Sequence, residues 1–372
     1  MLNVKRSEIP DLSGEIACPD SSEKSRFSGK IKVLIISFVI IGIGFNYSNA
    51  QLDRSTTKVS TTAAQFLKIG AGARAIGMAG AFSAMENDIY SIYWNPAGAS
   101  RIYGTGAVAF NHANWLADMS FDFAALAINI GDLGTLGFSF TSFRVPEEKV
   151  RTFENPDGDG RVWDASSLAL GLTYARNLTD NFSIGFTAKY IREAIWDMSA
   201  NTFAIDVGTL YTTPFNGLKI GASITNFGTK MRLDGRDIYI NVDPNANPNS
   251  GANNVPAEYR MNYYDIPLTF RIGLSMDIIR SSLFTATAAV DAVHPNDNTE
   301  YVNSGIELNF NRMIFARVGY KSLFMRDSEQ GLTFGFGVSY PIVNDIGLAF
   351  NYGYADFGRL KNVQFFDLTI QF

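Results

Sequence analysis

A two-residue alternation of large apolar and small polar side chains runs through most of the chain from about residue 103 onward. In the segment 332–340, Leu, Phe, Phe, Val and Tyr alternate with Thr, Gly, Gly and Ser. The same alternation recurs in the segments 218–225, 268–276 and 346–354. Because successive side chains of a β-strand point to opposite faces, this pattern predicts strands with one apolar face and one small, polar face.

The length and spacing of these segments suit strands that cross a membrane at a tilt. Segments of about 10 to 13 residues have that length. Fourteen of them begin near residues 103, 118, 133, 166, 180, 200, 217, 265, 281, 299, 312, 331, 345 and 362. The even-numbered connections are short, whereas two odd-numbered ones, 144–164 and 228–264, are long and rich in Asn, Asp, Pro and Gly. Short periplasmic turns that alternate with longer external loops are typical of outer-membrane barrels.

The composition of the two faces indicates which face would contact lipid. Gly, Ser, Thr and Ala on the polar face would leave a soluble barrel of this strand number nearly empty, whereas in a membrane barrel they leave room for a plug. The alternative, a secreted β-sandwich, has no reason to alternate short and long connections. We therefore expect an all-β fold, a fourteen-stranded antiparallel transmembrane β-barrel over residues 103–372.

The N-terminal part predicts export from the cytoplasm. Lys30 and Lys32 precede an apolar run over 33–45, which is too short to span a bilayer comfortably. We expect a signal peptide over 30–50, cleaved between Ala50 and Gln51, rather than a retained anchor, and a destination in the cell outer membrane. Residues 1–29 are expected to be a disordered extension or to follow a misassigned start. The one cysteine, Cys18, lies in that part, so the mature chain would contain no disulfide and no thiolate metal site.

The segment between the signal peptide and the strands, 51–102, has a different character. Its glycine spacing fits backbone that bends tightly or approaches other backbone closely. The glycines are Gly70, Gly72, Gly77 and Gly80, and the segment closes on Trp94, Asn95, Pro96, Ala97 and Gly98. We expect this segment to be a hatch that folds into the lumen.

The hatch sequence resembles a known family. TTAAQFLKIGAGARAIGMAGAFSAMENDIYSIYWNPAG, over 61–98, is similar to the N-terminal signature of the PorV/PorQ family, a branch of the FadL-like outer-membrane barrels. The resemblance continues in ASITNFG from Ala222, in DIPLTFRIG from Asp265 and in the last strand. The terminal Phe372 resembles the signal that outer-membrane assembly machinery reads.

The resemblance implies a fourteen-stranded barrel with a lumenal hatch, and two kinds of function. PorV-like members receive cargo from the type IX secretion translocon and present it for surface attachment. FadL-like members pass hydrophobic small molecules through the lumen. The implied partners are outer-membrane lipid, and either the translocon with its secreted cargo or a hydrophobic ligand.

Two features are candidate functional sites. Arg74 would lie in the lumen, where an arginine is stabilised by a carboxylate or carbonyl partner, and Asp206 and Asp291 are inward-facing candidates. We expect Arg74 either to pin the hatch to the wall or to be a solvated lumen arginine. The external loop 228–264 is the best partner-binding candidate because it is long and contains aromatic residues. Its aromatic candidates are Tyr239, Tyr259 and Tyr263, with Tyr264 beside them.

Few residue patterns in the sequence support metal binding or catalysis. Asn155, Asp157 and Asp159, followed by Gly160, have the spacing of the first half of a calcium loop, but Ser166 stands where the bidentate Glu should be. An exposed turn is the better interpretation, so no metal site is expected.

The remaining chemistry of the chain excludes several functions. The two histidines, His112 and His294, are far apart and have no paired acid or nucleophile, so we expect no enzyme activity and no cofactor. GAGARAIG is not followed by the strand and helix order of a nucleotide loop. A net charge of -5 with scattered charges gives no footprint for nucleic acid.

Overall fold

A computed structural model describes residues 58–243, 254–325, 328–343 and 346–372, which belong to one compact unit, Thr56–Phe372. The predicted extension 1–29, the signal peptide 30–50 and its cleavage site lie outside the described residues. The tip of the longest loop, 244–253, lies outside them as well.

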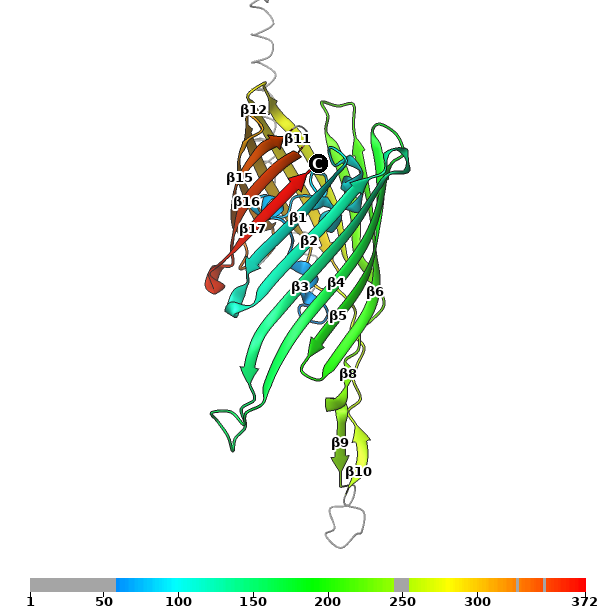
Figure 1. Cartoon of the computed structure of the whole chain (residues 1–372), viewed down its shortest axis with the longest axis vertical. Helices are drawn as coiled ribbons and strands as arrows, with labels where there is room; N and C mark the ends of the chain where they lie inside the picture. The colour runs from blue at the N-terminus through cyan, green and yellow to red at the C-terminus, as the bar shows by residue number, and fades with distance from the viewer. Residues whose placement is uncertain (1–57, 244–253, 326–327, 344–345) are drawn as a thin grey trace, which may run out of the picture. The chain divides into compact units, whose positions relative to one another are not determined.

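The described chain forms a closed antiparallel β-barrel (Figure 1). Its strands are β1 (Gly106–Asn114), β2 (Ser120–Asn129), β3 (Thr135–Lys149), β4 (Val162–Asn177), β5 (Phe182–Ile195), β6 (Met198–Thr212), β7 (Lys219–Gly228), β11 (Thr269–Arg280), β12 (Phe284–Pro295), β13 (Tyr301–Phe310), β14 (Ile314–Leu323), β15 (Leu332–Val343), β16 (Ile346–Asp356) and β17 (Asn362–Gln371). Each pairs with its neighbours in the sequence, and β1 pairs with β17 to close the barrel, with Ala107 opposite Gln371. The predicted fourteen-stranded barrel is confirmed.

Both long connections lie at one end of the barrel, and the described connections at the other end are all short. The start of β1 and the C-terminus are at the end with the short connections (Figure 1), where Phe372 N–H donates to the Gly106 carbonyl at 2.9 Å. The short turns at that end are 130–134, 178–181, 213–218, 281–283 and 311–313. Since outer-membrane barrels have short periplasmic turns, we call this the periplasmic end and the opposite one the external end.

Two connections at the external end differ from the expected lengths. The loop predicted over 144–164 is shorter, 150–161, because β3 and β4 extend beyond the barrel. A register shift between Val145 and Glu148 accommodates Pro146, which cannot donate a ladder hydrogen bond. The β5–β6 connection is only Trp196 and Asp197, because these two strands also extend outward.

The loop between β7 and β11 carries a small sheet of its own at the external end (Figure 1). β8 (Asp234–Gly235) pairs with β6, and β9 (Tyr239–Val242) pairs only with β10 (Val255–Glu258). Short 3-10 helices in the connections are η3 (Leu116–Asp118), η4 (Gly131–Leu133), η5 (Arg236–Ile238) and η6 (Gly358–Leu360). None of the described helices has the length and hydropathy needed to cross a membrane.

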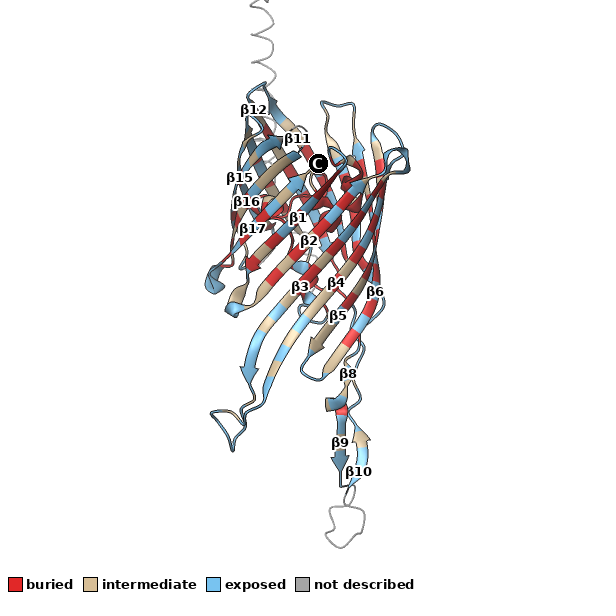
Figure 2. Ribbon diagram, in the orientation of Figure 1, coloured by how far each residue is buried: buried red, intermediate tan, exposed pale blue. Residues whose placement is uncertain are grey.

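The outer face of the barrel is apolar and exposed. On β15, Phe334, Phe336 and Val338 are 45%, 48% and 40% exposed, while the inward Thr333, next to Phe334, is 1% exposed. Figure 2 shows buried and exposed residues alternating along the barrel strands. An outer surface of large apolar side chains is what a barrel in lipid requires, because water-soluble proteins rarely leave such a continuous patch uncovered.

The segment before β1 packs against the inner face of the barrel. It contains η1 (Gln65–Lys68), α2 (Ala73–Gly77), α3 (Ser91–Trp94) and η2 (Pro96–Arg101). α2 contacts β14, β15, β16 and β17, whereas η2 contacts β3, β4, β5 and β6. Ala71, Ala73 and Phe82 are completely buried. The segment therefore contacts both sides of the wall, as a lumenal hatch does, and we refer to residues 58–102 as the hatch.

A row of glycines on the inner wall makes room for the hatch. A Cβ at Gly221 would lie 2.0 Å from the Ser83 carbonyl oxygen, and one at Gly305 would lie 2.6 Å from the Met78 carbonyl oxygen. Similar close approaches to the hatch occur at Gly185, Gly208, Gly273, Gly319, Gly335 and Gly353. The small inner residues of the alternation thus permit direct contact between hatch and strands.

Candidate functional site in the lumen

The described part of the hatch begins near the external end of the barrel. Ala63 N–H donates to the Asp265 carbonyl at 2.9 Å, and Ala64 N–H donates to Glu193 Oε2 at 2.9 Å. Lys68 Nζ lies 2.8 Å from Asp297, just after β12. At the other end of the hatch, Arg101 donates to Ser183 and Thr212, where β5 begins and β6 ends. The hatch therefore runs through the lumen from the external to the periplasmic end.

Asp297 gives the first turn of the hatch a pH-sensitive tether. Burial alone would raise the pKa of Asp297, but hydrogen bonds from Lys68, Gln65 and Thr62, together with the Lys68 charge, hold this pKa below its usual 3.8. A carboxyl with a depressed pKa contributes stability that is complete above its unfolded value and is lost as pH falls through the folded one.

We expect the start of the hatch to detach as pH falls below 3.8. A spin label on Val59→Cys, in a mature chain otherwise expected to lack cysteine, should give an immobile spectrum at neutral pH and a mobile one in acid. In an Asp297→Asn background the label should be mobile at neutral pH already. An immobile label in acid would contradict the tether.

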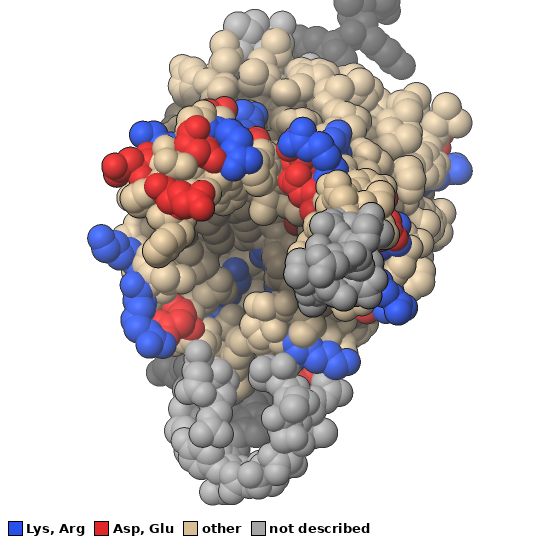
Figure 3. All heavy atoms as spheres, turned by 90° about the horizontal axis from the view of Figure 1, so that it is seen from below, with Lys and Arg blue, Asp and Glu red and all other residues tan. Residues whose placement is uncertain are grey.

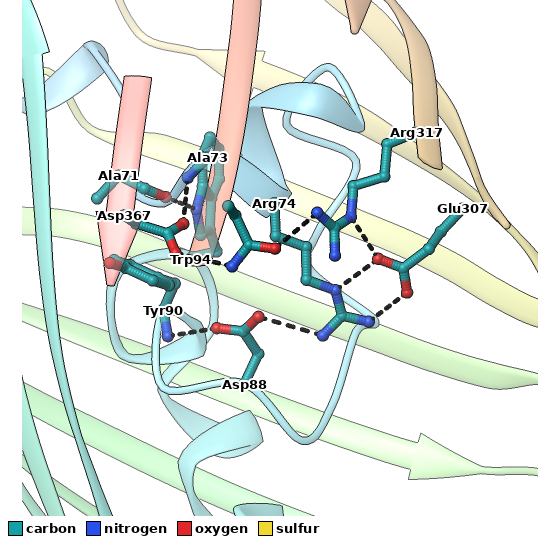
Figure 4. A network of polar contacts seen from close by, with 10 residues as sticks. Ala71, Ala73, Arg74, Asp88, Tyr90, Trp94, Glu307, Arg317 and Asp367 are labelled. Carbon is teal, nitrogen blue, oxygen red and sulfur yellow. Dashed lines mark hydrogen bonds and ion pairs between the residues drawn. The ribbon is translucent and has the colours of Figure 1, made fainter. Parts of the chain in front are cut away.

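Arg74, on α2, is held by two carboxylates (Figure 4). Its Nε and Nη2 donate to the two oxygens of Glu307 at 2.8 and 2.6 Å, and its Nη1 donates to Asp88 at 3.1 Å. The expected pairing with Asp206 or Asp291 was wrong. Both are buried and face inward, but Asp206 pairs with Lys189 at 2.6 Å, and Asp291 accepts hydrogen bonds from the hatch backbone.

A chain of polar contacts connects Arg74 to the closing strands of the barrel (Figure 4). Glu307 also accepts from Arg317 Nε at 2.6 Å, and Arg317 Nη1 donates to Asn351 at 2.8 Å. Asn351 Nδ2 then donates to Asp367 at 2.7 Å, and Asp367 accepts from the Ala73 N–H, also at 2.7 Å. The chain thus begins and ends on α2 and passes through β13, β14, β16 and β17.

A second wall carboxylate holds the middle of the hatch. Asp291 Oδ2 accepts from the N–H groups of Phe82 and Ser83 at 3.1 and 2.9 Å, and from the Ser83 hydroxyl at 2.6 Å. A carboxylate that accepts several hydrogen bonds orders the backbone that donates them. From the sequence, Asp291 could be recognised only as an acid on the small-residue face of a strand, without its partners.

The segment from Trp94 to Gly98 connects separate parts of the hatch to one another and to β6. Trp94 Nε1 donates to the Ala71 carbonyl at 2.9 Å. Asn95 Nδ2 donates to the carbonyls of Ser83 and Thr209 at 2.6 and 3.0 Å. Pro96 opens η2, where the Asn95 side chain accepts from Ala97 N–H. These contacts give the candidates a role in positioning the hatch.

The hatch glycines are needed for close packing. At Gly72, φ is +88° and a Cβ would lie 2.5 Å from the Tyr90 ring. At Gly77 a Cβ would lie 2.9 Å from the Gly335 backbone, so here hatch and wall glycines face each other. Gly70 and Gly80 lie against the Trp94 ring, and Gly98 lies against Ser91.

The predicted external candidates lie in the β7–β11 loop at the external end of the barrel (Figure 1). Tyr239, Tyr259 and Tyr263 are 64%, 59% and 60% exposed around the β9–β10 hairpin. In the weak calcium candidate, Asp159 pairs with Arg161, and the Asn155 carbonyl accepts from Gly158 N–H in a turn of the β3–β4 loop. Over the described ranges, no three His, Cys, Asp or Glu side chains are grouped as metal ligands would be.

The two histidines lie apart near the external end. His112 contacts Asp122 at 2.7 Å, and His294 contacts Glu300 at 2.9 Å. The expectation that neither histidine has an acidic partner was therefore wrong, but the two histidines lie on different strands, β1 and β12, and are not brought together.

Comparison with solved structures shows the fold. The chain is similar to the CymD monoaromatic hydrocarbon channel, with 11% identity, 82% of this chain and 97% of that chain covered, and a TM-score of 0.50. It is equally similar to the Pseudomonas putida toluene transporter TodX, with 11% identity, 81% and 97% coverage and a TM-score of 0.50. A Pseudomonas aeruginosa FadL homologue has 12% identity, 81% and 98% coverage and a TM-score of 0.49. At such low identity the likeness to CymD and TodX concerns the fold alone.

Comparison with protein families gives the relationship by sequence. No curated protein matches the chain. The family model described as "Type IX secretion system protein PorV" matches residues 51–253, which are 203 of the 372 residues. It thus covers the hatch and the first half of the barrel, the part in which the glycine-rich signature lies. The chain belongs to the PorV family of type IX secretion system proteins, and it is an outer-membrane β-barrel with the fold of the CymD and TodX channels.

Proposed function

We propose that this barrel receives secreted proteins at the external side of the outer membrane and presents them for attachment to the cell surface. In this role it binds the translocon and its cargo through the external loops and the external half of the lumen, and it catalyses no reaction. The signal peptide predicted over 30–50, with cleavage between Ala50 and Gln51, would deliver the chain to the periplasm for insertion.

The observation that carries this proposal is the anchoring of the hatch across the middle of the lumen. Glu307 binds Arg74, Asp367 and Asp291 bind the hatch backbone, and wall glycines contact it directly. A conduit would have to break these buried contacts each time the lumen opened, and separating one buried ion pair costs about 3–5 kcal/mol. A closed hatch instead leaves a recess at the external end, visible in Figure 3, as the place where partners can bind.

Deletion of the gene distinguishes this function from transport. We expect the deletion strain to lose surface display of secreted proteins while its uptake of toluene and long-chain fatty acids stays normal, and the wild-type gene to restore display. Normal display together with lost uptake would overturn the proposal in favour of a hydrophobic-substrate channel.

The aromatic residues of the β7–β11 loop are the proposed contact with the translocon. Substitution of Tyr239, Tyr259 and Tyr263 by serine should leave the heat stability of the barrel unchanged, because these side chains are largely exposed. Loss of such aromatic anchors typically costs about 2 kcal/mol or more each when they lie at an interface. We therefore expect much less of a large translocon barrel to co-purify with the triple variant.

The matched control lies in another external loop. Phe153, in the β3–β4 loop, is fully exposed, and Phe153→Ser should leave the amount of co-purified translocon unchanged. If the triple variant retained as much translocon as Phe153→Ser, the contact would have to lie elsewhere.

A further inference from the structure

Two cations inside the barrel have no acidic partner. Arg271 and Lys321 occupy inward positions of β11 and β14, and over the described ranges neither forms an ion pair. Arg271 is 9% exposed, its Nη1 donates to Thr225 Oγ1 at 3.1 Å, and its guanidinium lies 5.4 Å from the centre of the Trp94 ring. Other lumenal cations are paired, for example Lys68, Lys189, Lys219 and Arg317.

Both cations lie immediately on the external side of the hatch. On β11, Arg271 is one inward position further out than Gly273, whose Cβ would contact Ser83 of the hatch. On β14, Lys321 is likewise one inward position further out than Gly319, whose Cβ would contact Ala79. The two residues therefore lie on the wall where the external recess meets the hatch, and Figure 3 shows basic atoms deep in that recess.

The wall section between them is continuous and mostly polar, with Val293 as a buried apolar residue within it. Arg271 is opposite Val293, and Val293 is opposite Tyr301, so one row of paired residues joins β11, β12 and β13. Asn303 accepts from the Ser322 N–H, which joins β13 to β14 beside Lys321. Besides the cations, the inward positions on this side of the hatch include Thr225, Asn226, Thr269, Asn303 and Ser322.

The nearby carboxylates do not balance this charge. Asp291 is opposite Gly273, and its Oδ2 accepts from the hatch N–H groups of Phe82 and Ser83. The carboxylate of Asp291 lies close enough to Arg271 for their charges to interact, but the two side chains form no ion pair. Lys68, another cation of the lumen, is already paired with Asp297 at 2.8 Å, whereas Lys321 forms no ion pair over the described ranges. Burying a cation without a partner is costly, so a ligand that supplies the missing negative charge would be bound favourably.

The geometry points to Arg271 and Lys321 as an anion site at the floor of the external recess, which binds a carboxylate on an acidic peptide segment of a secreted protein. This inference rests on the proposed function, since it names the chemistry by which cargo is held. The planar guanidinium of Arg271 suits a carboxylate, and Lys321 adds a mobile ammonium. The polar wall favours a peptide over an alkyl chain, which requires an apolar lining.

Binding by the purified full-length protein in detergent tests the site. The probe is a fluorescently labelled peptide with three glutamates, and the same peptide with glutamines is the reference. We expect the glutamate peptide to bind about tenfold to a hundredfold more tightly, as the loss of charged hydrogen bonds implies. Arg271→Gln combined with Lys321→Gln should abolish this difference, whereas Lys149→Gln, which removes an exposed lysine at the end of β3, should preserve it.

Several results would overturn the inference. One is equal affinity for the two peptides, and another is an unchanged difference in the double variant. Binding of dodecanoate but not of the glutamate peptide would overturn the assignment to a peptide. A Lys321→Gln barrel that unfolds well below the wild-type temperature would show that this lysine has a structural role, whereas loss of an unpaired cation should leave the temperature unchanged or raise it.

The inference and the proposed function fail in different ways. A wild-type gene that restores surface display, while its purified product binds both peptides equally, overturns the carboxylate site alone. A deletion strain with normal surface display overturns the proposed function and, with it, the assignment of the site to cargo.

Discussion

Replacement of Glu307 by alanine is expected to release the hatch and to lower the free energy of unfolding by about 3–5 kcal/mol, the usual cost of removing one partner of a buried ion pair. Glu307 accepts from both Arg74 and Arg317, at distances from 2.6 to 2.8 Å. Without it, the buried guanidinium of Arg317 and the partly buried guanidinium of Arg74 lose their shared partner, and only Asn351 and Asp88 remain to bind them.

Three measurements check this expectation. The variant should lose its compact form in detergent gels at a lower temperature, trypsin should cut its hatch, and its conductance in planar bilayers should rise. Glu147→Ala, at an exposed position near the end of β3, should resemble the wild type in all three. A Glu307→Ala barrel with a protease-resistant hatch would show that Asp291 and Asp367 alone hold the hatch.

Arg74→Ala should have a smaller effect than Glu307→Ala. It removes one guanidinium, but Glu307 keeps its contact with Arg317, and Asp88, which loses its cation, keeps the hydrogen bond from Tyr90 N–H. Because Arg74 and Glu307 share one network, the two substitutions together should cost less than the sum of their separate effects. An additive double variant would contradict the proposed pinning of the hatch by Arg74.

The barrel could be predicted from the sequence because its signals are local. The alternation along each strand depends only on neighbouring residues, and the turn lengths separate one strand from the next. The largest error in a strand start is four residues, at β4 (166 against Val162) and β11 (265 against Thr269). At β4 the cause is the bulge beside Pro146, which lets the pair of strands continue into the expected loop.

The partner of Arg74 could not be predicted in the same way. Glu307 lies 233 residues away in the sequence, and it meets α2 because of the barrel register and the path of the hatch. Along β13, Glu307 shares the inward face with Asn303, Gly305 and Asn309, and its position on the strand does not distinguish it from the other polar residues there. Asp206 and Asp291 satisfied the same local criterion. Which inward acid binds Arg74 depends on where the hatch crosses each strand. No local sequence pattern contains that information.

Replacement of Gly221 by alanine is expected to prevent normal docking of the hatch although it adds only one methyl group. Its Cβ would lie 2.0 Å from the Ser83 carbonyl oxygen and 2.5 Å from the Ser83 carbonyl carbon, so backbone must move. In an open strand position alanine is more favourable than glycine by about 0.5–1 kcal/mol, whereas overpacking costs about 1–3 kcal/mol. The clash therefore outweighs the gain, and Gly221→Ala should lower the stability of the docked hatch.

Gly347→Ala is the matched control, because no atom lies within 4 Å of its Cβ, and its barrel should be as stable as the wild type or slightly more so. Trypsin digestion and heat-dependent gel mobility measure both variants. If Gly221→Ala and Gly347→Ala were equally resistant, the contact between wall glycines and hatch backbone would not hold the hatch in place.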